Sequence, residues 1–265
     1  MSVLLHISDP HFGTERSEVV DALLELHAAL GPELVVVSGD ITQRARASQF
    51  ARARAFFEQL TGSARLVIPG NHDVPLFNLA ARLFRPYGGY RRALGRELSP
   101  EFESADLCVI CLNTTRPWRF ENGEISSAQV RRVAQRLEGA DPAKLRVVVT
   151  HQPVHVITGK DGKNIAHGSE RAVRTWTASG ADLVLGGHIH LPYVRPLAEG
   201  YPGLARRSWI VQAGTAVSSR VRGAIPNSVN VLRFERASPK RCVVERWDYR
   251  SPSFRLQESE TLGLD

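Results

Sequence analysis

The sequence predicts an α/β fold in which two mixed β-sheets pack face to face and helices flank them. Three observations predict it. Short apolar runs alternate with segments of helical period up to about residue 190, strand-like runs without helices follow, and no linker or internal repeat divides the chain. Alternation followed by a strand-rich end favours an αββα arrangement of layers. At 265 residues, we expect one domain over residues 1–265.

The individual elements follow from these patterns. Runs rich in Val, Ile and Leu predict buried strands at Val3–Ile7, Leu34–Val37, Leu66–Ile68, Leu107–Leu112, Val147–Val149 and Leu183–Leu185. Helices are expected at Ser17–Leu30, Ser48–Leu60, Pro75–Phe84, Ser126–Leu137 and Ser169–Ser179, with serines as caps and Gly31 closing the first. Later strands are expected at Trp209–Gln212, Ser228–Phe234 and Cys242–Tyr249. We expect this tail to form a second sheet of antiparallel type.

The composition indicates an ordinary globular protein, with 43% hydrophobic and 23% charged residues. No apolar run approaches the roughly 20 residues that span a bilayer, and the N-terminus lacks the features of a signal peptide. We therefore expect a cytoplasmic protein. Cys108 and Cys111 form a CxxC, but they lie in an apolar strand where residues three apart face opposite ways. We interpret them as buried packing thiols, in keeping with three cysteines and a reducing compartment.

The net charge is +7 and the isoelectric point is about 9.8. Only four of the 34 basic residues are lysines, so 34 − 4 = 30 arginines are spread along the chain. This balance suits an anionic phosphate substrate without selecting one. A nucleic-acid partner stays open but is not favoured, because no nucleic-acid-binding module is recognisable. The sequence also leaves a homo-oligomer open.

Five predicted strands end in a carboxylate, an amide or an imidazole. The motifs are Asp9-X-His11, Gly39-Asp40, Gly70-Asn71-His72-Asp73, His151 and Gly187-His188-X-His190. Ligand sites in α/β sheets collect at the carboxyl ends of strands, so we expect these side chains to converge. Oxygen and imidazole donors without a thiolate are typical of sites for Mn²⁺, Fe, Zn²⁺ or Mg²⁺, and less so of a structural zinc site. A lone Asp-X-His is weak, but five motifs in order predict a metal centre.

Taken together, these motifs resemble the complete motif series of the calcineurin-like metallophosphoesterases, whose fold is a pair of sheets flanked by helices. The resemblance covers residues 9 to 190. It implies two divalent ions, Mn²⁺ or Fe in the first place and Zn²⁺ or Mg²⁺ as alternatives. It implies that one ion is held by Asp9, His11 and His190. It implies that the second is held by Asn71, His151 and His188, with Asp40 as the bridge between them.

The same resemblance implies that His72 binds no metal and faces the substrate, while Asp73 orients its neighbours. Two ions can clamp a phosphoryl oxygen and stabilise charge on the attacking and leaving oxygens. An alkoxide leaving group still needs a proton or a positive neighbour, and a histidine outside the metal shells can supply it. We therefore expect His72 and the bridging Asp40 to be the catalytic residues.

One departure from the family pattern concerns the substrate. In the protein-phosphatase branch a second aspartate and an arginine follow the Gly-Asp motif, whereas this chain has Gln43-Arg44. The carboxylate that orients the catalytic histidine in that branch is therefore missing. Arg44 is expected to bind a phosphate oxygen, with a solvated side chain as the alternative. The chain looks more like the bacterial phosphodiesterase branch, which includes cyclic-nucleotide and glycerophosphodiester enzymes.

We therefore expect a phosphodiesterase acting on a small anionic phosphodiester. The alternatives are an Mn-dependent nuclease, a nucleotide-sugar-lipid pyrophosphatase, and a scaffold without catalysis, which the full ligand set disfavours. His155 and His167 flank the loop Thr158–Asn164 and are expected to line the substrate pocket. The segment Leu76–Arg96 is either an ordinary amphipathic helix and loop or a basic, apolar cap for a lipid-linked or nucleotide substrate. Residues that could also reach the site are Arg220, Arg222, Asn227 and Asn230.

Overall fold

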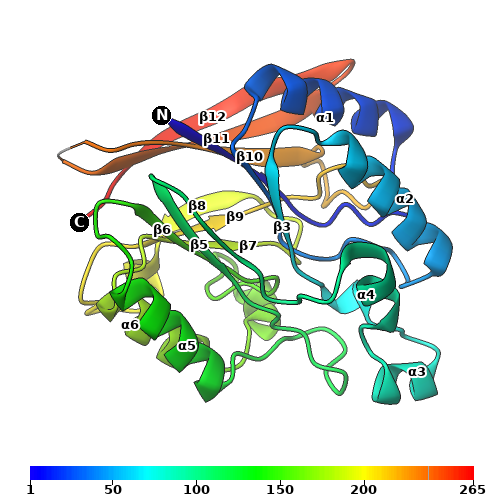
Figure 1. The fold of residues 1–265 in the computed structure, drawn as a ribbon, viewed down its shortest axis with the longest axis horizontal. Coiled ribbons are helices and arrows are strands. Elements are labelled where there is room, and N and C mark those ends of the chain that lie inside the picture. The colour runs from blue at the N-terminus through cyan, green and yellow to red at the C-terminus, as the bar shows by residue number, and fades with distance from the viewer. Residues whose placement is uncertain (238) are drawn as a thin grey trace.

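The described residues form two six-stranded β-sheets that stack face to face (Figure 1). The computed structural model describes residues 1–237 and 239–265. The first sheet has the order β12-β11-β10-β1-β2-β3. Its strands are β1 (Ser2–Ile7), β2 (Leu34–Val37), β3 (Ala64–Val67), β10 (Ser228–Glu235), β11 (Arg241–Arg250) and β12 (Ser253–Gly263). The second sheet has the order β4-β5-β6-β7-β9-β8. Its strands are β4 (Glu101–Glu103), β5 (Leu107–Cys111), β6 (Leu145–Val149), β7 (Leu183–Gly186), β8 (Tyr193–Pro196) and β9 (Trp209–Gln212).

Helices cover the outer faces of both sheets. The α-helices are α1 (Ser17–Leu30), α2 (Ala47–Gln59), α3 (Leu79–Phe84), α4 (Gly88–Leu94), α5 (Ser127–Glu138) and α6 (Ser169–Ala178). Short 3₁₀ helices are η1 (Asn71–Asp73), η2 (Gly159–Asn164) and η3 (Leu197–Glu199). Helices α1 and α2 lie over the first sheet, and α5 and α6 lie over the second (Figure 1). Among residues 1–237 and 239–265, no helix has the length and apolar character to cross a membrane.

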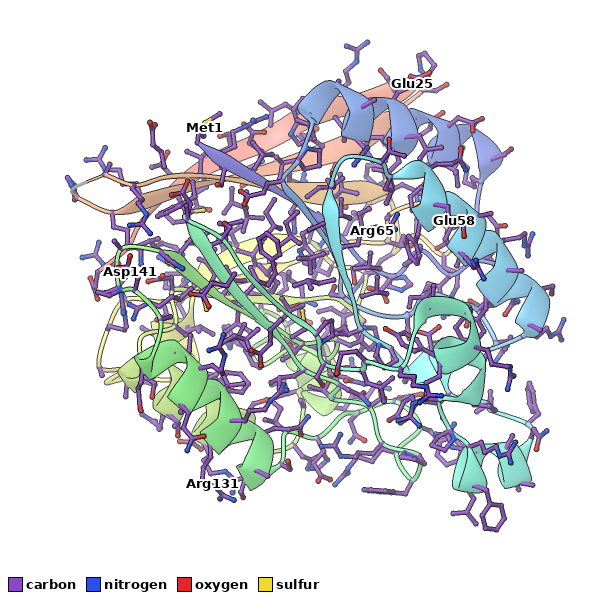
Figure 2. All side chains as sticks on the ribbon, viewed as in Figure 1. Met1, Glu25, Glu58, Arg65, Arg131 and Asp141 are labelled. Carbon is purple, nitrogen blue, oxygen red and sulfur yellow. The ribbon has the colours of Figure 1, made fainter. Side chains whose placement is uncertain are left out.

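Alternation along the strands divides the core into three layers. On β1, Leu4 belongs to the cluster between the two sheets, whereas Leu5 faces α1 and α2. On β6, Val147 lies in the same central cluster and Val148 lies under α5 and α6. Side chains fill the spaces between these layers (Figure 2). Because both faces of each sheet are buried, the strands read as continuous apolar runs, which explains why the sequence pattern locates them.

The predicted fold class is confirmed, but the prediction of a separate antiparallel sheet in the tail is wrong. Strand β9 pairs parallel to β7 in the second sheet, while β10 pairs antiparallel to β1 in the first. The tail therefore completes both sheets, and each sheet is mixed. Strands β4, β8 and β12 were not expected. They are short or largely exposed edge strands, so they lack an apolar run that marks them.

The boundaries of several helices also differ from those expected. The helix expected at Pro75–Phe84 begins at Leu79, where the Asn78 side chain caps it by accepting from the Ala81 amide at 2.9 Å. Ser126 caps α5, accepting from the Gln129 amide at 3.2 Å. The other expected caps, Ser17, Ser48 and Ser169, lie within their helices. Gly31 ends α1 in the left-handed conformation, as expected.

Cys108 and Cys111 lie on opposite faces of β5. Cys111 packs in the cluster between the sheets, and Cys108 packs beneath α5 and α6. Both are free and buried, and burial raises the pKa of each thiol. This confirms the interpretation as packing thiols.

Candidate metal centre

The polar motifs lie at the carboxyl ends of five parallel strands, three in the first sheet and two in the second. Strands β1, β2 and β3 lead into the first three motifs, and β6 and β7 lead into the last two. Because the sheets stack, these ends face one another. Two groups of side chains result, each with one ligand atom per residue within 4.8 Å of the others: Asp9, His11 and His190, and Asp40, His151 and His188.

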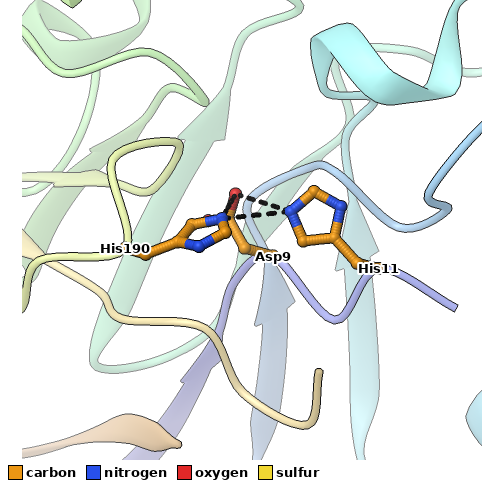
Figure 3. A group of neighbouring side chains, drawn as sticks. All are labelled: Asp9, His11 and His190. Carbon is orange, nitrogen blue, oxygen red and sulfur yellow. Dashed lines mark hydrogen bonds and ion pairs between the residues drawn. The ribbon is translucent and has the colours of Figure 1, made fainter. Parts of the chain in front are cut away.

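In the first group, two imidazole nitrogens point at each other beside a carboxylate (Figure 3). His11 Nε2 lies 3.0 Å from His190 Nε2. Asp9 Oδ1 lies 3.2 Å from His190 Nε2 and 3.7 Å from His11 Nε2. Three donors from two loops, one after β1 and one after β7, converge on one point, which is the arrangement expected of a metal shell.

In the second group, Asp40 faces both sets of ligands. Its Oδ1 lies 3.2 Å from His151 Nε2, and its Oδ2 lies 3.7 Å from His11 Nε2 of the first group. Asn71 Oδ1 lies 3.1 Å from His151 Nε2, which adds an amide oxygen to the group. A carboxylate with one oxygen toward each group has the geometry that bridging requires.

A buried hydrogen-bond chain leads to Asp9. Ser8 Oγ donates to Asp9 Oδ2 at 2.6 Å, and Ser38 Oγ donates to Ser8 Oγ at 2.8 Å. His6 Nε2 lies 2.9 Å from Ser38 Oγ, and Asn230 Nδ2 lies 3.4 Å from His6 Nδ1. Since the amide nitrogen of Asn230 only donates, His6 accepts at Nδ1 and donates at Nε2 to Ser38. Burial lowers the pKa of His6 to about 3, which keeps this ring neutral.

Two ligand rings are oriented by main-chain oxygens. His151 Nδ1 lies 2.8 Å from the carbonyl of Ser38, and His190 Nδ1 lies 2.7 Å from the carbonyl of Arg220. Carbonyls only accept, so each Nδ1 carries a proton, and each Nε2 is the nitrogen that faces the group. Fixed tautomers of this kind are typical of metal-ligating histidines.

Asp73 ties the ligand loops together. Its carboxylate accepts from the backbone amides of Ile41, Thr42 and Gly70 at 2.8–3.0 Å. Burial and the neighbouring Asp40 carboxylate raise its pKa to about 6. Both carboxylate oxygens of Asp73 therefore accept hydrogen bonds from the backbone of the loops that carry Asp40 and Asn71.

The backbone at the motifs is strained. Among the described residues, six non-glycine residues have positive φ, and five of them are Asp9, His11, Asp40, His188 and His190, at 44–73°. Such conformations cost about 1–3 kcal/mol each and cluster at functional sites. Gly39 shows how tightly the loops approach: its φ is 100°, and a Cβ there would lie 2.5 Å from His151 Nδ1.

The ionised carboxylates of the two groups, and their buried polar atoms without hydrogen-bond partners, are features expected beside bound cations. Within the described chain, Asp9 Oδ1, which faces two imidazole nitrogens of the first group, and His188 Nδ1 are buried without a hydrogen-bond partner. Burial opposes ionisation of Asp40, but the neighbouring His151 and His72 hold its pKa well below the ordinary value. Burial would lower the pKa of His151, but Asp40 outweighs it and raises that pKa to about 9. Carboxylate, amide and imidazole donors are those that Mn²⁺, Fe and Zn²⁺ accept, so the residues fit a pair of such ions.

A cavity of about 520 Å³ opens at the two groups, and a smaller one of about 290 Å³ adjoins it. His72 and Arg220 line both cavities. Arg220 Nη1 lies 3.3 Å from His72 Nε2 and donates to Gln43 Oε1 at 3.0 Å. His72 Nδ1 lies 2.9 Å from the carbonyl of Gln43. The main chain of Gln43 therefore orients His72, in the place of the missing second aspartate.

The three predicted substrate contacts lie in different places. Arg44 is exposed and lines the smaller cavity. His155 is half-buried and packs edge-on against Tyr201, with 6.3 Å between ring centroids. His167 is exposed, and its Nε2 lies 3.1 Å from Asn122 Nδ2. Within residues 1–237 and 239–265, neither histidine is among the residues that line the two cavities.

The loop between these histidines does reach the site. Asp161, Lys163 and Asn164 line the larger cavity, and Arg222 Nη2 lies 2.9 Å from Asp161 Oδ2. We expected the two flanking histidines to line the substrate pocket, whereas the residues that line the larger cavity lie within the loop itself. Ser8 and Ser38 were not predicted as site residues, although each of them directly follows a strand, as Asp9 and Asp40 nearly do. Glu121, which lines both cavities, carries no signal in the sequence.

The sequence model of the calcineurin-like phosphoesterase family matches residues 2–192. The chain belongs to this family. A probable cyclic nucleotide phosphodiesterase of Synechococcus sp. is 27% identical to it over 167 residues, covering 62% of this chain and 60% of that relative. The match thus spans less than two-thirds of the relative's length.

Solved structures show the same fold at low identity. A purple acid phosphatase from yellow lupin (Lupinus luteus) seeds has a TM-score of 0.71 and 12% identity, over 99% of this chain and 53% of that one. A dimetal phosphatase from Danio rerio has a TM-score of 0.68 and 15% identity, over 100% and 99%. Vps29 of Chaetomium thermophilum has a TM-score of 0.51 and 10% identity, over 100% and 98%. The αββα architecture is therefore that of the metallophosphatases.

Proposed function

We propose that this chain is a two-metal phosphoester hydrolase that cleaves a small phosphodiester. The observation that carries the proposal is Asp40, whose two oxygens face two separate groups of ligand side chains. One ion would be held by Asp9, His11 and His190. The other would be held by Asn71, His151 and His188, with Asp40 shared by both. Mn²⁺ or Fe is proposed first, with Zn²⁺ or Mg²⁺ as alternatives.

When bound, two such ions supply positive charge opposite the phosphoryl oxygens of the substrate. The chain's own residues would do the rest. His72 lines the cavity next to Asn71 and would protonate or stabilise the leaving oxygen from its Nε2 face. Arg220, held by Gln43, stands beside that face and would hold a phosphoryl oxygen by charge-assisted hydrogen bonds.

A diester is favoured over a monoester by two observations. The relative from Synechococcus sp. is named a probable cyclic nucleotide phosphodiesterase, and Gln43 stands where the protein-phosphatase branch has a carboxylate. The cavity beside the ligands has about 520 Å³, within the usual range for small-molecule sites. Arg220 lines both cavities, and its guanidinium contacts the uncharged side chain of Gln43 and the ring of His72, so its charge is available to an anionic ligand.

The test is a substrate panel with protein reconstituted with Mn²⁺. It compares bis-p-nitrophenyl phosphate with p-nitrophenyl phosphate, and adds cyclic nucleotides, glycerophosphodiesters and single-stranded DNA. We expect the bis ester to be cleaved at a higher kcat/KM than the monoester. An Asp40→Asn variant prepared identically controls for a contaminating phosphatase. Faster turnover of the monoester would overturn the diester assignment, and preferential cleavage of DNA would favour a nuclease.

A further inference from the structure

Large apolar side chains gather on one corner of the molecule, outside the candidate centre. Of the ten exposed large hydrophobic residues in the described chain, six lie on residues 75–84 or 117–120: Phe77, Leu79, Leu83, Phe84, Trp118 and Phe120. Their exposed fractions are 54–80%. We call these two segments the α3 shelf. Helix α3 lies at the edge of the fold, away from both sheets (Figure 1).

The shelf is held in shape by a buried arginine. Arg82 is only 5% exposed. It donates to the carbonyls of Pro75, Pro117 and Arg119 at 2.6–3.0 Å, and its guanidinium lies 4.2 Å from the centroid of Phe120. A buried guanidinium is costly unless its donors are satisfied, and here they join the two segments. Arg82 therefore holds the two segments that carry the exposed side chains against each other.

Cationic residues surround the same apolar side chains. A groove of about 610 Å³ beside α3 is lined by Phe77 and Phe84 together with arginines. These arginines are Arg44, Arg46, Arg85 and Arg92. All four are exposed, and no acidic residue of the described chain lines this groove. The protruding apolar groups of the shelf therefore lie beside a cluster of four exposed arginines.

The shelf is continuous with the candidate centre. Arg44 and Leu76 line both the groove and the cavity of about 290 Å³, and His72 lines that cavity too. A surface that contacts the shelf would therefore lie next to the mouth of the candidate site.

We propose that the α3 shelf docks on an anionic phospholipid membrane. The aromatic and leucine side chains insert at the interface, and the arginines contact lipid phosphates. Protruding aromatic and leucine side chains beside basic residues are the pattern of interfacial anchors, and anionic lipids attract the cations. A second copy of the chain fits less well, because a two-fold contact would bring the same four arginines against each other.

The experiment uses vesicles of phosphatidylcholine, with and without 20 mol% phosphatidylglycerol, at about 100 mM salt. We expect co-sedimentation with the anionic vesicles and much less with the neutral ones. Of the four tryptophans, Trp118 is 67% exposed, Trp176 is buried, and Trp209 and Trp247 are half-buried on strands outside the shelf, so the part of the emission change that depends on Trp118 reports the contact. We expect a blue shift with anionic vesicles that is lost in Trp118→Ser.

Paired variants separate the two parts of the surface. Arg85→Gln with Arg92→Gln should weaken binding about 30-fold, since each arginine near an anionic surface contributes about 1 kcal/mol. Phe77→Ser with Phe84→Ser should weaken it at least about tenfold. The matched controls are Arg255→Gln and Leu256→Ser on β12, both exposed and at the far edge of the first sheet, which should bind as the wild type does.

Three outcomes would overturn the proposal. They are no binding to anionic vesicles, equal binding to neutral ones, and equal losses in the β12 controls. A dimer in sedimentation velocity that the phenylalanine variant abolishes, without vesicle binding, would assign the shelf to a second copy instead. Hydrolysis of soluble bis-p-nitrophenyl phosphate should be unchanged in the shelf variants. Membrane docking and diester hydrolysis can therefore fail independently.

Discussion

The substitution Ser8→Ala tests whether the buried hydrogen-bond chain positions Asp9. In the wild type, Ser8 Oγ donates to Asp9 Oδ2 at 2.6 Å and is itself fixed by Ser38 Oγ. Alanine removes this donor with little change in volume. Asp9 Oδ2 keeps the backbone amide of His188 as a second donor, at 2.8 Å. The carboxylate therefore stays ionised and in place, but it becomes freer to rotate.

The expected loss follows from the kind of bond removed. A hydrogen bond to a charged acceptor contributes about 1.5–3 kcal/mol. Removing a residue that orients a metal ligand commonly weakens metal affinity about 10–100-fold. Since one donor to Asp9 Oδ2 remains, we expect the lower end of that range, about tenfold. The ion held by Asp9 should be affected more than the ion held by Asn71.

The assay is a Mn²⁺ titration of metal-stripped protein by calorimetry, together with thermal unfolding. Ser208→Ala is the matched control, because Ser208 is also a buried serine that donates a hydrogen bond, at 2.7 Å to the carbonyl of Ala181, outside the candidate centre. Both variants should lose stability, Ser208→Ala less because its acceptor is a neutral carbonyl, but only Ser8→Ala should lose metal affinity. Wild-type affinity in Ser8→Ala would refute the positioning role of the chain from His6 to Asp9.

Three further predictions concern the proposed ions and the proposed role of His72. Asp40→Ala should weaken both ions together, measured as metal content after dialysis; retention of one ion at wild-type affinity would exclude the bridge. His72→Ala should keep its metals and lose about 10²–10⁴-fold in turnover, least for p-nitrophenolate leaving groups. Lost metal would instead make His72 a ligand. Stripping the ions should lower Tm by about 8–16 °C, from about 4 kcal/mol of binding energy in a chain of this size; an unchanged Tm would contradict ligation by the folded state.

The features that could be predicted from the sequence are those that a short stretch of residues marks by its own pattern. Strands buried on both faces appear as apolar runs, and the polar residue after each run marks the edge where ligands collect. His11 and His190 could thus be expected near each other, although 179 positions separate them, and their ring nitrogens lie 3.0 Å apart. Pairing of the tail could not be predicted this way, since β10 joins β1 across more than 200 residues.

Side-chain direction and long-range contacts account for the rest. His155 follows His151 by four residues, but the loop turns its ring toward Tyr201. Nothing local separates Arg220 from the other arginines of the chain. Its place depends on the contact of its carbonyl with His190 and of its side chain with Gln43. These contacts exist only once the tail has folded against the motif loops.

The candidate centre depends on both sheets at once. Asp9 follows β1 of the first sheet, and its partner His190 follows β7 of the second; Asp40 and His151 are divided in the same way. Neither group of ligands exists until the sheets have packed, so an ion would bind the folded chain and not the unfolded one. Binding would then stabilise the fold, by about 4 kcal/mol at a thousand times Kd. That contribution opposes the strain of the left-handed residues, at about 1–3 kcal/mol each. The motif loops can therefore hold conformations that are costly in the absence of the ions.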